Sequence, residues 1–452
     1  MKIRRFLSVF LLLLMLSTLY LPGAAAIEEM QVEAKAAILV DGKTGEVLYG
    51  QNEHQQLYPA SVTKVTTCLL VMEAVAEGKL SYDDMITVTA SALSGLAEDG
   101  STADIKEGEV LSARDLMYCM LLASANEACN ILAEKVSGSV SAFVDAMNQR
   151  VKDLGCENTH YVNASGLHDE NHYSSAWDIY LITKEAMKHE EFMDFCNTTS
   201  YEIPATDISP KRTLHTTNSL LDNWNAVGYM YKYAQGIKTG HTSDAGYCLV
   251  SSAVKGEKEL ISVVLGAERV NLDDGSRRTQ SFTETARLFE WGFNNFSVQE
   301  ILSSTEMICE LPVALSNEAN YVALHPETSL SATLPNDVTP EQLTRTVTLY
   351  EESANAPITE GTAYGELSIS YGGQVRGTVK LVAYSDVSAS PFLTVKYALT
   401  QFFGKTIVKI LSVLVLALVV VFVVYRVFFA KRRSRRYGSS RRHVSNYRGR
   451  RR

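Results

Sequence analysis

The apolar segment from Ile407 to Ala430 limits more than any other feature what this chain can fold into. Only Lys409, Ser412 and Arg426 interrupt it. Because Lys409 and Arg426 can extend their charged ends to the two membrane surfaces, the segment reaches the roughly 20 residues that a spanning helix needs. A helix lying flat on the membrane is the alternative, but Leu411–Val424 has no polar face for water. The segment 407–430 is therefore predicted to be a transmembrane helix.

The residues after this segment are strongly basic. Residues 431–452 contain one Lys, ten Arg and no acidic residue, a charge of +11. Because Lys- and Arg-rich ends stay in the cytoplasm, the tail is predicted to be cytoplasmic and the preceding chain extracellular, at the cell membrane. A basic run beside a span more often meets anionic lipid headgroups than nucleic acid, so membrane lipids are its predicted partner and no nucleic-acid partner is expected.

The N-terminus is organised like a secretory signal peptide. Lys2, Arg4 and Arg5 come first, an apolar run follows, and Ala24–Ala26 supplies small residues for cleavage. We predict that residues 1–26 are removed, with an uncleaved anchor as the alternative. The net charge is −9, so setting aside the +11 tail and the +3 start leaves −23 for residues 6–430. This acidic balance does not favour a polyanionic partner.

The seven cysteines do not form a recognisable framework. Their number is odd, and neither a CxxC pair nor a Cys/His cluster has the spacing of a metal site. Most lie in apolar surroundings, so we predict buried free thiols rather than disulfides. Neither a metal nor a cofactor is expected.

Between the signal peptide and the span lie roughly 380 residues, more than one hydrophobic core usually holds, so two domains are expected. Residues 27–296 mix helices and strands, and residues 297–390 carry short strand-like runs separated by Pro, Gly and Asn. The first domain is therefore predicted to be mixed α and β (α+β), and the second a small all-β domain. The first domain is predicted to contain a hairpin over 36–49, helices over 63–77, 114–136 and 140–154, and paired strands over 247–254 and 259–267.

A serine and a lysine three positions apart, Ser61 and Lys64, form the first candidate site motif. If Ser61 opens a helix, Lys64 lies one turn away on the same face. A serine hydroxyl needs a base to take its proton, and a lysine can serve if burial and a cationic neighbour such as Lys238 lower its pKa. The free N–H groups of the helix start can stabilise an oxyanion. Taken alone, the pair is more often a capping serine with a surface lysine.

Ser124 and Asn126 form the second motif, because they interrupt an apolar stretch. Buried polar side chains need partners. Ser124 is a candidate proton relay to a leaving group, and Asn126 a candidate amide clamp on a substrate backbone. For this motif alone, a capping or turn Ser/Asn is the commoner interpretation.

The third motif is Lys238, Thr239 and Gly240, followed by His241. Glycine permits close backbone approach, so an edge strand here can pair with an extended peptide. Lys238 and Thr239 can then bind a carboxylate, and His241 adds a donor, although an ordinary strand end is the alternative. The three motifs in this order on an exported chain are rare by chance, and together they predict a serine acyl-transfer site with lysine as the base.

With their surroundings, these motifs resemble the D-alanyl-D-alanine carboxypeptidases among the low-molecular-mass penicillin-binding proteins. The resemblance covers about residues 30–390 and implies a penicillin-binding/β-lactamase-like catalytic domain followed by the family's β-rich domain. The segments that carry it are Tyr58–Lys64, Asn163–Leu167, Ser175–Asp178, Lys238–Thr242, Ala245–Tyr247, Ile358–Gly361 and Gly365–Leu367.

The resemblance implies removal of the terminal D-alanine from peptidoglycan stem peptides. Ser61 would attack the carbonyl between the two D-alanines, Lys64 would be the general base, and Ser124 would pass the proton to the departing D-alanine. Water would release the acyl-enzyme, and β-lactam antibiotics would trap it. The implied substrate-binding residues are Asn126, Lys238, Thr239, Gly240 and His241, with the backbone N–H groups of Ser61 and His241 as oxyanion hole.

One departure from the family pattern concerns the substrate carboxylate. The family often has an arginine shortly before the helix that ends in Trp-Gly-Phe, here Trp291–Phe293, but Ser281 stands at that place. No carboxylate-binding arginine can therefore be assigned from the sequence. A DD-endopeptidase or transpeptidase would use the same residues and stays open. The β-rich second domain argues against a β-lactamase, and the intact motifs argue against a non-catalytic cell-wall scaffold.

Overall fold

The computed structural model describes residues 30–429, so the predicted signal peptide and the basic tail lie outside the described residues. The chain divides into two compact units. The first runs to Gln299 and includes Ala332–Thr339, and the second consists of Glu300–Ser331 and the chain from Pro340 onward. Each unit is described by itself below.

A five-stranded antiparallel sheet forms the centre of the first unit, in the order β2-β1-β9-β8-β7. The predicted hairpin and the predicted paired strands are both present, as β1–β2 and β8–β9. Strand β7 lies at the edge of the sheet, so one of its sides is free for an extended peptide. The strands are β1 (Ala36–Asp41), β2 (Val47–Gln51), β7 (Ala234–Thr242), β8 (Gly246–Lys255) and β9 (Lys258–Ala267).

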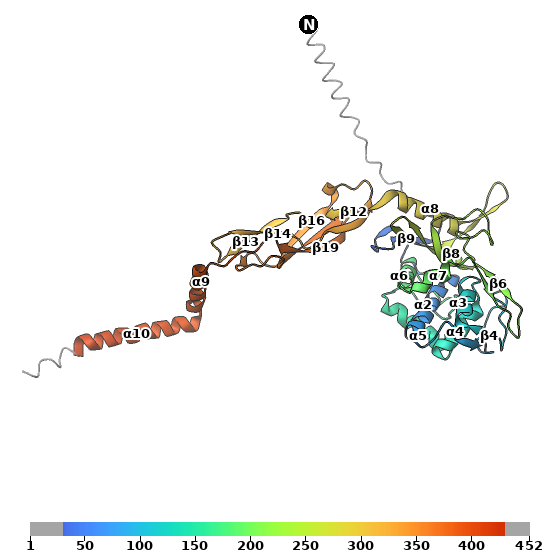
Figure 1. Ribbon diagram of the computed structural model, residues 1–452, viewed down its shortest axis with the longest axis horizontal. Helices are drawn as coiled ribbons and strands as arrows, with labels where there is room; N and C mark the ends of the chain where they lie inside the picture. The colour runs from blue at the N-terminus through green and yellow to red at the C-terminus, as the bar shows by residue number, and fades with distance from the viewer. Residues whose placement is uncertain (1–29, 430–452) are drawn as a thin grey trace, which may run out of the picture. The chain divides into compact units, whose positions relative to one another are not determined.

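Helices cover both faces of this sheet (Figure 1). On one face, helix α8 (Gln280–Asn295) buries Leu288, Phe289 and Phe293 against Leu39 and other sheet residues. On the other face, the remaining helices share the large core with Ile38, Val250 and similar residues. Those helices are α2 (Lys64–Ala76), α3 (Ala113–Leu121), α4 (Asn126–Ser137), α5 (Val140–Asp153), α6 (Ala176–Ala186) and α7 (Glu190–Asn197).

Two helix predictions need correction. The helix predicted over 114–136 is two helices, α3 and α4, because Ser124 has a φ of 59°, a left-handed conformation that no continuing α-helix accepts. Ser61 does not open an α-helix either. It lies in a short 3₁₀ turn, η1 (Ala60–Thr63), and α2 begins at Lys64.

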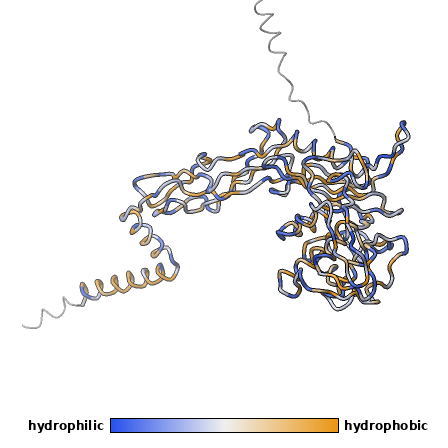
Figure 2. Tube along the Cα trace, turned by 45° about the vertical axis from the view of Figure 1, so that its right-hand side comes forward, coloured by the Kyte–Doolittle hydropathy of each residue, from blue (hydrophilic) through white to orange (hydrophobic). Residues whose placement is uncertain are grey.

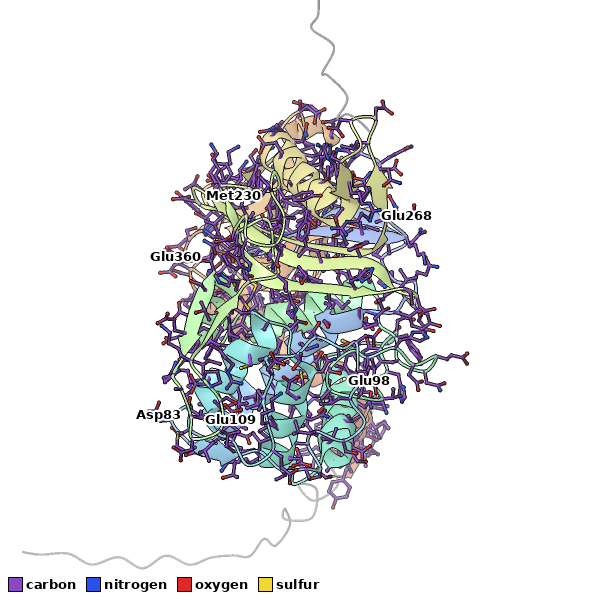
Figure 3. The ribbon with its side chains drawn as sticks, turned by 90° about the vertical axis from the view of Figure 1, so that its right-hand side faces the viewer. Asp83, Glu98, Glu109, Met230, Glu268 and Glu360 are labelled. Carbon is purple, nitrogen blue, oxygen red and sulfur yellow. The ribbon has the colours of Figure 1, made fainter. Side chains whose placement is uncertain are left out.

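Three small hairpins complete the first unit. They are β3 (Met85–Thr87) with β4 (Val110–Ser112), β5 (Ser200–Ile203) with β6 (Arg212–His215), and β10 (Arg269–Asn271) with β11 (Arg277–Thr279). Figure 3 shows Glu109, which directly precedes β4, among the helices, and Glu268, which precedes β10, at the level of the sheet. All seven cysteines are free, and six of them are buried, as predicted.

The second unit is rich in β-structure, as predicted. Its six-stranded sheet has the order β16-β18-β19-β14-β13-β17. The strands are β13 (Cys309–Ala314), β14 (Tyr321–Pro326), β16 (Thr344–Leu349), β17 (Ala354–Asn355), β18 (Ala363–Tyr371) and β19 (Gln374–Ala383). The second unit also contains the 3₁₀ turn η2 (Pro340–Gln342) and helices α9 (Pro391–Gly404) and α10 (Thr406–Phe429). The strand pair β12 (Phe296–Leu302) and β15 (Leu330–Pro335) falls mostly in the first unit, which includes Phe296–Gln299 and Ala332–Pro335.

Helix α10 corresponds to the apolar segment with which the sequence analysis began. Residues Thr406–Phe428 are long and apolar enough to cross a membrane, and none of the side chains in that window is buried in the protein. Figure 2 shows this helix as a continuous hydrophobic stretch. Its length and hydropathy are those of a membrane span.

Candidate active site

The nucleophile candidate Ser61 lies on a tightly held turn. Ala60, which precedes it, has a φ of 48°, a conformation that L-residues rarely adopt. Gly166 lies directly against this turn, since a Cβ at Gly166 would lie 1.9 Å from the Ala60 carbonyl oxygen. No other residue could replace Gly166 without moving the turn. The segment around Gly166 thus fixes the backbone on which Ser61 lies.

Lys64 is the centre of a buried hydrogen-bonded cluster. Its Nζ lies 2.9 Å from Ser61 Oγ, 2.8 Å from Asn126 Oδ1 and 2.7 Å from the Ser165 carbonyl oxygen. The side chain is fully buried, and this burial lowers the pKa of Lys64. The oxygens of Asn126 and Ser165 can only accept, whereas the Ser61 hydroxyl can donate. A neutral Lys64 amine therefore has its lone pair left for the proton of Ser61.

A histidine that the sequence analysis did not single out supports the same turn. His172 Nδ1 accepts a hydrogen bond from the Val162 N–H at 3.2 Å, so its Nε2 carries the proton and donates to Thr63 Oγ1 at 2.8 Å. Burial lowers the pKa of His172 to about 3. The imidazole therefore stays neutral, and its hydrogen bond holds Thr63 in place between Ser61 and Lys64. His172 stands in the polar run 168–175, and no motif there marks it for this role.

The two residues of the second motif, Ser124 and Asn126, have different partners. Asn126 begins α4 and is 8% exposed, with its side-chain oxygen bonded to Lys64. Ser124 is also buried, but it is not among the three partners of Lys64. Its left-handed backbone, which costs of order 1 kcal/mol, ends α3 and lets the chain turn toward the cluster.

The third motif brings a second buried lysine. Lys238 is 1% exposed, and its Nζ donates to the carbonyl oxygen of Thr239 at 2.9 Å. Burial, and then repulsion from the charge of Lys64, lower the pKa of Lys238 to about 7. Two ammonium groups in one desolvated region oppose each other's protonation. The pair therefore favours a neutral amine near neutral pH.

Gly240 lets the edge strand β7 approach the nucleophile turn. A Cβ at this position would lie 2.8 Å from the Pro59 carbonyl oxygen and 3.0 Å from the Ser61 nitrogen. Next to it, Thr239 Oγ1 lies 2.6 Å from Thr217 Oγ1. Only glycine allows β7 to approach the turn this closely, so the backbone of β7 lies against the backbone nitrogen of Ser61.

At the far end of the motif an arginine lies beside His241. The His241 ring lies at a tilt against the Tyr247 ring, with 4.1 Å between their centres, and the guanidinium of Arg269 lies 5.6 Å from the centre of the Tyr247 ring. Partial burial, and then the charge of Arg269, lower the pKa of His241. No sequence motif marks Arg269. It supplies a cation near His241, whereas Ser281, at the start of α8, supplies none.

The structure thus links Ser61, Lys64 and Asn126 in one cluster and places Gly240 against it, with Lys238 and Thr239 on the same strand. Ser124 and His241 lie on its two flanking elements without a hydrogen bond to Lys64. Among residues 30–429, no group of three or more His, Cys, Asp or Glu side chains is placed to hold a metal ion. The arrangement can activate a hydroxyl beside two converging backbone segments.

Comparison with known proteins identifies the family of the chain. The sequence pattern of the D-alanyl-D-alanine carboxypeptidase family matches residues 23–269, and that of the penicillin-binding protein 5 C-terminal domain matches residues 296–389. A D-alanyl-D-alanine carboxypeptidase of Bacillus subtilis is 30% identical over 397 residues, which is 86% of this chain and 96% of that relative.

Two further similar proteins are a solved structure and a relative that is named for a different activity. The crystal structure of penicillin binding protein 5 from Haemophilus influenzae is 30% identical, covers 80% of this chain and all of its own, and superposes with a TM-score of 0.62. A D-alanyl-D-alanine endopeptidase of Pseudomonas aeruginosa is 28% identical over 272 residues, 60% of this chain and 80% of the relative.

Proposed function

The chain belongs to the D-alanyl-D-alanine carboxypeptidase family, and we propose that it removes the terminal D-alanine of peptidoglycan stem peptides through an acyl-enzyme on Ser61. The observation that carries this proposal is the contact of the buried Lys64 amine with Ser61 Oγ at 2.9 Å. A fully buried lysine without a carboxylate partner in hydrogen-bond contact is poised to be neutral, which is what a general base requires.

In the acylation step, Lys64 takes the proton of the Ser61 hydroxyl as the oxygen attacks the carbonyl between the two D-alanines. The oxyanion that forms is held by backbone N–H groups of Ser61 and His241, which Gly240 allows to converge. The substrate backbone pairs with the free side of β7. Asn126 clamps the substrate amide from the opposite side of the cluster.

The C–N bond then breaks, and the departing amine of D-alanine takes a proton through Ser124 from the protonated Lys64. The carboxylate of the same D-alanine is held by Thr239, with Arg269 and His241 at the end of the strand. A water molecule, deprotonated by the same lysine, hydrolyses the ester and restores the Ser61 hydroxyl. A β-lactam ring would acylate Ser61 by the same attack, but its leaving group would stay tethered.

The test uses the full chain in detergent with a fluorescent penicillin and with a pentapeptide that ends in D-Ala-D-Ala. We expect covalent labelling and release of D-alanine, both lost in Ser61→Ala and both kept in the matched control Ser141→Ala, an exposed serine on α5. If Ser61→Ala is labelled like the wild type, the acyl-enzyme is not on Ser61.

A DD-endopeptidase is the second candidate, because the Pseudomonas relative carries that name. The same residues would then cut the D-alanyl bond of a cross-linked peptide. Incubation with a cross-linked muropeptide dimer separates the two activities. Faster cleavage of the dimer than release of D-alanine from the pentapeptide would favour the endopeptidase.

We also propose that α10 anchors the protein in the cell membrane, with the catalytic unit outside and the basic tail in the cytoplasm against anionic lipid. The support is the apolar composition of α10, which only a few polar residues interrupt, and the charge that follows it. In whole cells, externally added protease should degrade the catalytic unit and leave an epitope at the C-terminus intact. Digestion of that epitope would reverse the proposed orientation.

A further inference from the structure

A loop formed by residues 100–103 packs directly on Asn126. The backbone N–H of Asn126 donates to the Ser101 carbonyl oxygen at 2.9 Å. A Cβ at Gly100 would lie 2.8 Å from the Asn126 side-chain nitrogen, so this loop touches the amide itself. The position of the loop therefore decides where the amide of Asn126 can lie.

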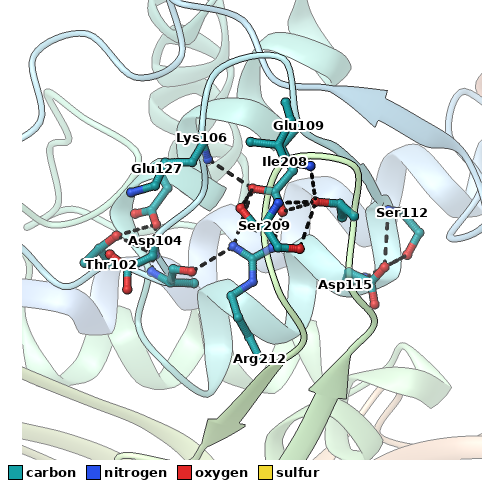
Figure 4. Close-up of polar contacts among 12 residues, drawn as sticks. Thr102, Asp104, Lys106, Glu109, Ser112, Asp115, Glu127, Ile208, Ser209 and Arg212 are labelled. Carbon is teal, nitrogen blue, oxygen red and sulfur yellow. Dashed lines mark hydrogen bonds and ion pairs between the residues drawn. The ribbon is translucent and has the colours of Figure 1, made fainter.

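Glu127, which follows Asn126 on α4, also binds loop 100–103. Glu127 is 3% exposed, and its Oε1 accepts from Thr102 Oγ1 and from the Ala103 N–H, each at 2.7 Å (Figure 4). Both contacts run from loop 100–103 to the residue beside Asn126. The loop and the start of α4 thus form one hydrogen-bonded piece.

Arg212 of β6 holds this loop from the other side. Its Nη1 donates to the Ala103 carbonyl oxygen at 3.0 Å, while its Nη2 pairs with Glu109 (Figure 4). Glu109 is completely buried and the Arg212 side chain is 13% exposed. Three further donors to the Glu109 carboxylate complete its solvation: Thr206 Oγ1, Ser209 Oγ and the Lys106 N–H. A carboxylate that is bonded on all sides holds the guanidinium in a fixed place.

The chain that carries Arg212 then continues to the opposite side of the candidate site. Two hydrogen bonds attach it to β7: the 2.6 Å contact of Thr217 with Thr239, and a bond from the Asn218 side-chain amide to the Gly236 carbonyl oxygen. Residues 212–218 therefore touch both the loop against Asn126 and the strand that carries the third motif. They bridge the two sides between which a substrate would lie.

From these contacts we propose that Arg212 is a positioning residue for acylation. By joining the Ala103 carbonyl to Glu109, it holds loop 100–103 against Asn126 and so fixes the distance from Asn126 to β7. The inference rests on the proposed function, in which Asn126 clamps the substrate. Arg212 touches none of the reacting groups itself, so its effect must pass through Asn126.

The variant Arg212→Lys tests this in the full chain, because one ammonium can keep the charge beside Glu109 but cannot also reach Ala103. We expect acylation by the fluorescent penicillin to slow about tenfold, since displacement of a positioned group by about 1 Å has effects of this size or larger. In an Asn126→Ser background, where hours of labelling measure the residual rate, Arg212→Lys should slow acylation less than about twofold.

Arg150→Lys is the matched control, because Arg150 also bridges two partners, Glu73 and Glu185, at 2.7 and 2.8 Å. Because this pair is partly exposed, Arg150→Lys should lose little stability, and it should acylate at the wild-type rate. The inference is overturned if Arg212→Lys acylates normally, if Arg150→Lys slows acylation equally, or if Arg212→Lys is equally harmful in both Asn126 backgrounds. A wild-type chain that takes no label would instead contradict the proposed function.

Discussion

Two largely buried basic side chains of the first unit, Lys64 and Arg212, are satisfied in opposite ways. Lys64 is surrounded by a hydroxyl, an amide oxygen and a backbone carbonyl, whereas Arg212 pairs with a buried carboxylate. Neutral oxygens compensate a buried charge poorly, so burial lowers the pKa of Lys64. The Glu109 carboxylate compensates the guanidinium directly, so the two form a structural ion pair. Burial thus prepares one cation to give up its proton and keeps the other as a structural tie.

Removing the Lys64 amine should have the largest effect, on the rate of acylation. We expect Lys64→Met to slow acylation by the fluorescent penicillin by at least about a thousandfold, because general-base catalysis and the hold on Asn126 are both lost. Stopped-flow or manual labelling measures the rate. Lys79→Met, an exposed lysine, is the control and should behave as wild type. Acylation of Lys64→Met at a comparable rate would show that another group is the base.

Breaking the second site should mainly affect stability. Glu109→Met leaves Arg212 buried without its partner and should lower the free energy of unfolding by roughly 3–5 kcal/mol, whereas the double variant with Arg212→Met should lose less. All three tryptophans lie in the first unit, so tryptophan fluorescence in urea reports on that unit.

The ion pair of Glu73 with Arg150, whose side chains are each 26% exposed, is the reference with which this loss of stability is compared. Glu73→Met should lower the free energy of unfolding by no more than about 1 kcal/mol. A double variant less stable than Glu109→Met would mean that the buried ion pair does more than satisfy its own charges.

A smaller effect is expected at Arg269, whose charge would contact the substrate rather than another part of the protein. Arg269→Gln should raise the KM for the D-Ala-D-Ala pentapeptide about tenfold with a smaller change in kcat, because a charged hydrogen bond to the carboxylate is lost. The control is Arg277→Gln, an exposed arginine on the neighbouring strand β11. An equal rise in KM in both variants would indicate a general electrostatic effect.

The smallest change concerns the pH at which the base becomes active. Acylation needs the neutral amine, so its rate should fall as the pH falls through the pKa of Lys64. Because repulsion between two ammonium groups is mutual, Lys238→Gln should raise the pKa of Lys64 and move the midpoint of the rate profile to higher pH. A midpoint that stays in place would mean that burial alone lowers the pKa.

Local sequence patterns indicated much of the fold. Alternating apolar residues and turn signals predicted β1–β2 and β8–β9, and the change of texture predicted a β-rich second unit. The helix over 114–136 was wrong because apolar residues at helical spacing lie on both sides of Ser124, whereas the left-handed backbone of Ser124 separates α3 from α4. Periodicity describes which face is buried, and it cannot register one residue that leaves the helical region.

The candidate site was predictable to the extent that it consists of motifs. Ser61, Lys64, Asn126 and the residues of β7 belong to short patterns with a chemical reason for their spacing. His172, Thr217, Arg212 and Arg269 do not, because each acts through a partner far away in the sequence. A residue whose importance lies in one long-range contact carries no local signal.

By itself, the sequence determined the family, the identity of the nucleophile and base candidates, and an apolar segment of membrane-spanning length, because these depend on residue types and short spacings. Only the tertiary structure decided that Lys64 is fully buried among neutral oxygens, that Arg269 stands beside His241, and that Arg212 joins the Ala103 carbonyl to Glu109. A pKa or a position depends on what surrounds a side chain, and folding alone brings those surroundings together.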